Sequence, residues 1–262
     1  MLRGVRLSRN RLTQLTEQIN ASGYGLTLGV HTRIDETITQ VTTGAKVGNL
    51  YVNRNMVGAV VGVQPFGGEG LSGTGPKAGG PLYLYRLLAN RPEGALRKTF
   101  DRQDAEQPVD SSVRAGLISA HQALQAWAQD KPELLALCQR YDQLAQAGTV
   151  RLLPGPTGER NTFTLLPREH VLCIADNQQD ALTQLAAVTS VGSTAIWQDD
   201  ELHRGLQASL PGAVKSQVVL VKDVLAAAFD AVIYHGDADQ LRILCEQVAA
   251  RDGAIVSVQG FA

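Results

Sequence analysis

The chain has 262 residues, is 44% hydrophobic, and carries 24 basic against 25 acidic residues, for a formal net charge of −1. This size and composition allow one large core or two modest ones. The charge is balanced and lysine and arginine do not cluster, which argues against nucleic acid or anionic lipid as a partner of this region. No apolar run approaches the roughly 20 residues of a membrane span. We therefore expect small-molecule or protein partners.

Two amphipathic helices are predicted near the start, in residues 8–20 and from about residue 33, because apolar residues recur there every three or four positions. The β-rich run "VGNLYVN", residues 47–53, predicts a strand. The first 95 residues offer these helices little to pack against. We expect this part to belong to something larger.

Residues 90–112 change character, because proline, glycine and charge dominate and apolar periodicity disappears. They are the best candidate for a domain boundary. Helical spacing then returns in about residues 112–129 and 132–146. Residues 93–149 are accordingly predicted to be a linker and helical connector.

From residue 150 onward, short apolar runs alternate with amphipathic segments, a pattern typical of a parallel sheet covered on both faces. The runs are "TFTLL", "HVLCIA", "STAIW", "SQVVLV", "DAVIYH" and "GAIVSV". We therefore predict a Rossmann-like α/β domain over residues 150–262. The dinucleotide fingerprint GxGxxG is missing, and the nearest feature, "LPGPTGER" at 153–160, has two glycines in the wrong frame. A nucleotide site there is disfavoured.

Cysteine and histidine do not form a recognisable site in the sequence. Cys138, Cys173 and Cys245 are odd in number, far apart, and each lies in an apolar segment. Buried reduced thiols in a cytoplasmic protein are expected, with Cys245 in "RILCEQV" facing the core. The five histidines are scattered without ligand spacing, so no metal site is predicted.

The stretch "GAVVGVQPFGGEGLSGTGPKAGGP", residues 58–81, is the richest in glycine. A phosphate loop needs its glycines between a strand and the N-terminus of a helix. Here Pro76 and Pro81 follow instead, and no convincing helix opens behind them. A phosphate site is therefore a weak interpretation of these glycines.

Three longer segments resemble a known family. They are "NASGYGLTLGVHTR" (20–33), "GAKVGNLYVNRNMVGAVVGVQPFGG" (44–68) and "SGTGPKAGGP" (72–81). They resemble the closing part of an aldehyde dehydrogenase catalytic domain, in the subfamily acting on L-glutamate γ-semialdehyde, which is in equilibrium with Δ1-pyrroline-5-carboxylate. The continuation, ending "AIVSVQGFA", resembles the C-terminal region of the bacterial, bifunctional proline utilization A family.

The resemblance implies three substrate-binding residues. Gly58 and Ala59 match a pair whose backbone N–H groups hold the substrate's α-carboxylate, and Phe66 matches an aromatic that packs on its aliphatic part. Backbone donors suit a carboxylate, and a residue without a bulky side chain lets it come close. Gly58 could instead serve a turn, and Phe66 could be a core residue.

The neighbouring residues are expected to have structural roles. The later glycines more plausibly shape the loop than touch a ligand, and Ser72 could bond its own backbone. Asn53, Arg54 and Lys77 are most simply solvated or structural.

The parent reaction implied by the family uses a cysteine nucleophile and NAD, with FAD in the proline-oxidising half. The family's nucleophile and nicotinamide-binding segments would lie before Met1. None of the three cysteines looks activated, so no catalytic, cofactor-binding or metal residue is assigned here. The region alone is expected to bind no cofactor and to be inactive.

For residues beyond 95, the resemblance implies a degenerate nucleotide-binding fold that covers the internal channel between two active sites, with the terminal "VSVQGFA" reaching the dehydrogenase. The alternative is a stabilising appendage. The remainder of the parent chain is the expected partner of residues 1–92, and the exposed faces of residues 8–43 predict a homo-oligomer. A different class of function also stays open: a self-standing assembly or nucleotide-binding domain without catalysis.

Overall fold

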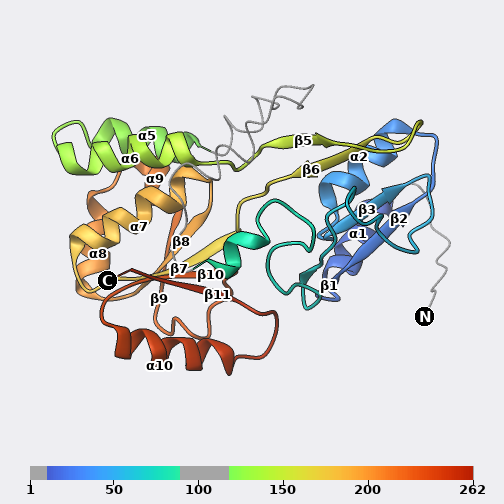
Figure 1. Ribbon diagram of the computed structural model, residues 1–262. Coiled ribbons are helices and arrows are strands. Elements are labelled where there is room, and N and C mark those ends of the chain that lie inside the picture. The colour runs from blue at the N-terminus through green and yellow to red at the C-terminus, as the bar shows by residue number, and fades with distance from the viewer. Residues whose placement is uncertain (1–10, 89–117, 262) are drawn as a thin grey trace. The chain divides into compact units, whose positions relative to one another are not determined.

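The computed structural model describes residues 11–88 and 118–261 (Figure 1). These residues fall into two compact units, one of residues 11–88 with 252–255 and one of residues 118–251 with 256–261. The predicted boundary at 90–112 lies outside the described residues. The mixed α/β fold expected from the sequence is confirmed.

The first unit, called unit 1 below, contains two helices and four short strands. The elements are α1 (Leu12–Asn20), β1 (Tyr24–Gly25), β2 (Thr27–Val30), α2 (Asp35–Gly44), β3 (Asn49–Val52), β4 (Glu69–Gly70) and a 3-10 helix, η2 (Leu84–Leu87). Strands β2 and β3 pair in parallel, and β1 and β4 pair antiparallel. The two helices and the strand predicted from periodicity are confirmed.

Unit 1 buries little. Among its described residues, Val41 and Tyr51 are the only hydrophobic side chains that are buried. Large apolar side chains are exposed throughout it, including Tyr24, Leu84 and Leu87. The amphipathic pattern of the sequence therefore produces helices and strands here without producing a core.

The second unit, called unit 2, contains a larger set of elements. They are α5 (Ser119–Trp127), α6 (Pro132–Leu144), β5 (Val150–Leu153), β6 (Asn161–Thr164), β7 (His170–Ile174), α7 (Gln178–Ser190), β8 (Thr194–Gln198), α8 (Glu201–Ser209), α9 (Gly212–Lys215), β9 (Val218–Val221), β10 (Ala231–His235), α10 (Ala238–Ala249) and β11 (Ser257–Phe261). None of the helices in the described ranges is both long and apolar enough to cross a membrane.

A five-stranded parallel sheet organises unit 2, with the strand order β11-β10-β7-β8-β9. The chain starts in the middle at β7, moves outward to β9, and returns to the other side through β10 and β11. This order matches a Rossmann-type sheet, in which the direction of winding reverses between the first and fourth strands. The predicted parallel architecture is confirmed.

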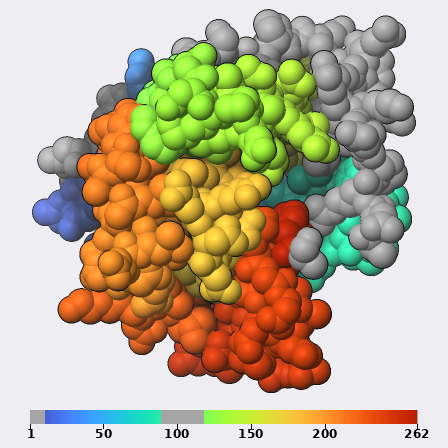
Figure 2. Space-filling view, turned by 90° about the vertical axis from the view of Figure 1, so that its left-hand side faces the viewer, coloured from blue at the N-terminus to red at the C-terminus, as the bar shows by residue number. Residues whose placement is uncertain are grey.

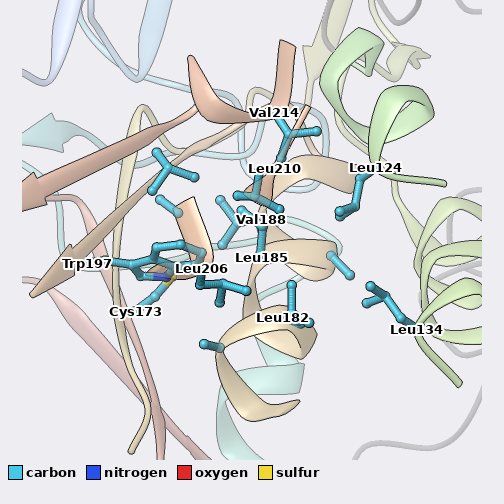
Figure 3. Close-up of a cluster of buried hydrophobic side chains, with 14 of the residues drawn as sticks. Leu124, Leu134, Cys173, Leu182, Leu185, Val188, Trp197, Leu206, Leu210 and Val214 are labelled. Atoms are coloured by element: carbon cyan, nitrogen blue, oxygen red, sulfur yellow. The ribbon is translucent and has the colours of Figure 1, made fainter. Parts of the chain in front are cut away.

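Successive residues of the central strands point to opposite faces of the sheet, and each face has its own core. On one face, Cys173, Ala195 and Trp197 pack with α5, α6, α7 and α8 (Figure 3). On the other, Leu172, Ile196 and further residues pack against α10. Helices thus cover both faces, as Figure 1 shows.

The helix pair α5–α6 belongs to unit 2. Both helices pack on α7, and in Figure 2 the green pair lies directly beside the gold residues of the following helix. His121 of α5, fully buried, ties the three helices together: its Nε2–H donates to the Cys138 carbonyl of α6 (3.0 Å), and Nδ1 lies 2.9 Å from Thr189 Oγ1 of α7.

Two of the strands predicted for unit 2 need correction. The run "TFTLL" does not join the parallel sheet, and its first three residues belong to β6, which forms an antiparallel hairpin with β5. Only a short loop separates β6 from β7, and a parallel crossover needs a dozen or more residues. The run "GAIVSV" contributes only its end, because β11 begins at Ser257.

Cys245 is exposed rather than core-facing, although Cys138 and Cys173 are buried as predicted. On α10 the buried positions are Leu244 and Val248. Cys245 is one residue further along than Leu244, which turns its side chain about 100° around the helix and away from the sheet.

Candidate functional site

The loop between β3 and β4 carries all three predicted substrate-binding residues, and its two ends are fixed by asparagines. At one end, Asn53 has a left-handed backbone (φ 55°), and its side-chain amide bonds the backbone of Thr32 in both directions at 2.9 Å. At the other end, the Asn49 side chain donates to the Pro65 carbonyl (2.9 Å) and accepts from Gly67 N–H (3.1 Å). The segment between them is held at its base.

Gly58 and Ala59 lie within this loop, outside any helix or strand. Neither backbone N–H donates to another group in the described part of the chain. Gly58 has no left-handed φ, and a Cβ built on it would meet nothing within 4 Å. Neither backbone strain nor crowding therefore requires glycine at this position, and both amides are open to a ligand.

Phe66 lies at the end of the loop and is half-buried. Its backbone forms a bridge with Ala78, donating at 3.0 Å and accepting at 2.8 Å. No hydrogen bond between described residues joins Phe66 to Gly58 or Ala59. The three residues share one loop, and the structure fixes Phe66 more firmly than the other two.

The glycines around this loop are constrained by close backbone approach. A Cβ on Gly48 would collide with the Gly67 carbonyl, and one on Gly68 with the backbone of Ser72. Gly70 and Gly79 have positive φ, 56° and 71°. Sequence reasoning missed Gly48, whose only signal was a glycine inside the strand predicted over residues 47–53.

Lys77 supports the same backbone junction. Its Nζ donates to the Gly48 carbonyl, and burial lowers the pKa of the ammonium group, with Glu69 partly opposing that shift. The Lys77 side chain therefore helps to hold the base of the loop in place.

The loop exposes apolar side chains on both sides of Gly58 and Ala59. Val57 is 93% exposed and Val61 is 97% exposed. An apolar surface of this kind normally meets another surface.

Unit 2 does not fit a dinucleotide. The turn after β7 reads Ala175-Asp176-Asn177, without the glycines that let a pyrophosphate approach the backbone. Asn177 caps α7 by accepting from Asp180 N–H (2.9 Å), and its Nδ2 donates to the Asp180 carboxylate (2.7 Å). Two carboxylates thus lie where a phosphate would need positive potential.

The crevice where the winding of the sheet reverses is occupied by Gln184, which is fully buried. Its Nε2 donates to the Ile174 carbonyl at the end of β7 (2.7 Å) and lies 2.9 Å from His235 Nδ1 at the end of β10. The segment "LPGPTGER" lies between the hairpin strands β5 and β6, and Gly158 there has φ 88°. It does not open a helix.

One group of possible metal ligands occurs in the described ranges, formed by Glu169, His170 and Asp230 within 4.8 Å of one another. The Asp230 carboxylate accepts backbone N–H groups of Glu169 (3.1 Å) and His170 (3.0 Å). We assign it the structural role of joining β7 to the start of β10.

Both units are similar in sequence to known proteins. Residues 7–89 match the model of the aldehyde dehydrogenase family. Over its whole length the chain is 72% identical to bifunctional protein PutA of Escherichia coli (strain K12) and, over 99% of it, 40% identical to that of Rhizobium meliloti. The similarity to the Escherichia coli PutA protein extends over the whole of this chain. It spans about 20% of the length of each of these PutA proteins.

Two further proteins are similar to parts of the chain or to most of it. Over 29% of this chain and 15% of its own length, 1-pyrroline-5-carboxylate dehydrogenase 1 of Halalkalibacterium halodurans is 51% identical. The solved structure of PutA from Corynebacterium freiburgense covers 95% of the chain and 22% of its own, with a TM-score of 0.58 at 21% identity, and it supports the fold. The resemblance inferred from the glycine-rich segments is confirmed.

Proposed function

We propose that this region is a non-catalytic part of a bifunctional enzyme that oxidises proline to glutamate. Unit 1 (within residues 1–92) completes the substrate site of an NAD-dependent L-glutamate γ-semialdehyde dehydrogenase, and residues 150–262 form a covering domain joined by the connector 93–149. The observation that carries the proposal is the loop of Gly58 and Ala59, whose two unpaired amides sit on a braced base.

In this site the chain's own residues bind and orient the substrate. The N–H groups of Gly58 and Ala59 donate to the α-carboxylate, which fixes the far end of the molecule. Phe66 packs on the aliphatic chain and excludes water, which holds the aldehyde toward the catalytic residues of the remaining chain. The remaining chain would hold NAD, which would supply the hydride acceptor for the aldehyde, and FAD, which would supply the oxidant for proline.

Replacing Ala59 with proline removes one N–H donor, so the test compares Ala59→Pro with Ala59→Gly in the complete PutA enzyme. Loss of one hydrogen bond to a charged group predicts a rise in KM for the semialdehyde of about tenfold to a hundredfold in the proline variant. The glycine variant keeps its N–H and should stay within about threefold of wild type. Equal KM values in the two variants, or unchanged kinetics in both, contradict the assignment.

For unit 2 we propose that it covers the channel carrying the intermediate between the two active sites. The support is that unit 2 has its own core, lacks glycines in the turn after β7, and holds the Gln184 side chain between the ends of β7 and β10. Deleting residues 255–262 from the complete enzyme should lengthen the lag before NADH forms from proline. An unchanged lag with lowered thermal stability would favour the alternative, a stabilising appendage.

The competing function, a self-standing nucleotide-binding or assembly domain, is tested by calorimetry of this chain with NAD⁺. Our proposal predicts no specific heat of binding and no NADH production from pyrroline-5-carboxylate. We also propose a cytoplasmic protein and a homo-oligomer formed through unit 1, which light scattering of this chain would detect.

A further inference from the structure

Two side chains hold the backbone amides on either side of residues 58–59, the donor pair of the proposed substrate site. On one side, Val57 N–H donates to Asn55 Oδ1 (3.4 Å). On the other side, Val60 N–H donates to Gln64 Oε1 (3.1 Å). An amide N–H that already has an acceptor is not offered to a ligand, so these two bonds leave the N–H groups of the donor pair for the carboxylate.

The bond from Val60 to Gln64 is part of a closed turn. The backbone N–H of Gln64 donates to the Val60 carbonyl (2.9 Å), and Val63 N–H donates to the same carbonyl (3.1 Å). Inside the turn, Gly62 has a φ of 80°, a left-handed conformation that glycine adopts without strain. Gln64 therefore holds both polar groups of the Val60 backbone, one with its side chain and one with its own backbone.

Gln64 also joins this turn to the fixed base of the loop. It directly precedes Pro65, whose carbonyl accepts from the Asn49 side chain of β3 (2.9 Å). Gln64 is half-buried, whereas Asn55 is exposed and its bond to Val57 N–H is the longer of the two. Of the two side chains beside the donor pair, Gln64 is the more firmly supported.

The planarity of the peptide bond carries this order to the donor pair. Fixing Val60 N–H fixes the whole peptide group that joins Ala59 to Val60, because its atoms lie in one plane. Only the two peptide groups that carry the N–H of Gly58 and of Ala59 then lie between it and the peptide group held by Asn55. A stretch this short, fixed at both ends, has few conformations, so a carboxylate that binds there orders little additional chain.

We propose that Gln64 is a positioning residue for the carboxylate of the substrate. It accepts the amide next to the donor pair and thereby holds the two open N–H groups in place, without touching the substrate itself. The inference rests on the proposed function, because it concerns the same substrate site.

The test compares Gln64→Met with wild type in the complete PutA enzyme, because methionine keeps the length of the side chain and removes the acceptor. KM for L-glutamate γ-semialdehyde should rise about threefold to tenfold, as expected for one neutral hydrogen bond, while kcat stays within about twofold. The matched control is Gln40→Met, which removes the bond from Gln40 Nε2 to Thr13 Oγ1 between α2 and α1 (2.7 Å) and should leave KM unchanged. An unchanged KM in Gln64→Met, or an equal rise in both variants, overturns the proposal.

A double-mutant cycle with Ala59→Pro shows whether Gln64 acts through the donor pair. Proline at this position already removes one of the two donors, so adding Gln64→Met to it should raise KM by less than about twofold. An undiminished factor in the proline background overturns the positioning role. If Ala59→Pro alone leaves KM unchanged, the proposed substrate site is wrong and the inference is wrong with it, whereas a failure confined to Gln64→Met leaves that site intact.

Discussion

Unit 2 buries whole helix faces, whereas unit 1 buries hardly any of its apolar residues. On α7, Leu185 and Ala186 have no exposed surface, and Trp197 beside them is equally enclosed. In unit 1, Val41 and Tyr51 are the only buried hydrophobic residues among those described, and each keeps 5% of its surface exposed. Both units show the same amphipathic periodicity in sequence. The difference teaches that periodicity specifies an element, while a core also requires a partner surface.

The largest effect should come from a cavity in the core of unit 2. Leu185→Ala removes a fully enclosed side chain and should lower the free energy of unfolding by about 2–5 kcal/mol, measured by urea unfolding. Leu87→Ala in unit 1, at a side chain that is 72% exposed, should change it by less than about 0.5 kcal/mol. A comparable loss in both variants would remove the contrast between the units.

Glycine substitutions should lower the free energy of unfolding at the base of the loop in unit 1 but not in its open part. Gly48→Ala places a methyl group on the Gly67 carbonyl and should cost about 1–3 kcal/mol, because backbone must shift. Gly58→Ala has open space and should cost less than about 0.5 kcal/mol. Circular dichroism and urea unfolding check both, and a folded, wild-type-like Gly48→Ala protein would contradict this account of the loop's base.

Acid should loosen the helices of unit 2 through His121. Burial lowers the pKa of this ring below its usual 6.5, although the Cys138 carbonyl and Asp142 partly oppose the shift. Between the folded and unfolded pKa values the unfolded chain binds more protons, so stability falls as pH drops below about 6.5. Thermal unfolding at pH 7 and pH 5 measures this loss. His121→Gln should reduce the dependence of the thermal stability on pH. An unchanged dependence would mean that other titratable groups cause the loss of stability in acid.

The smallest effect concerns thiol labelling. Burial raises the pKa of the Cys138 thiol to about 11 and that of Cys173 further still, while Cys245 is exposed on α10. A thiol reagent should label one cysteine rapidly at pH 8, and Cys245→Ser should abolish that phase. Rapid labelling of two or more thiols would mean that the core of unit 2 opens.

Much of the fold was predictable because its elements are regular. The sheet of unit 2 consists of short apolar runs, and alternation of faces explains why "HVLCIA" and "STAIW" read as unbroken hydrophobic segments. The prediction for "TFTLL" was wrong because the apolar content of this run is similar to that of a strand in the parallel sheet. Only the short loop after it, with no room for a crossover helix, distinguishes the two.

The candidate site was predictable only as far as the family resemblance reached. Gly58, Ala59 and Phe66 came from matched motifs, and their assignment stays a proposal. The packing role of Gly48 depends on a residue far away in sequence, Gly67. No local pattern carries that information.

Amide hydrogen exchange of the chain tests the central claim that unit 1 lacks a self-sufficient core and unit 2 has one. Amides of β7, β8 and α7 should exchange through global unfolding, with protection factors at least about a hundredfold above those of β2, β3 and α2. Addition of the rest of a PutA dehydrogenase domain should then slow unit 1 selectively. Equal protection of both units in the chain alone would contradict the account.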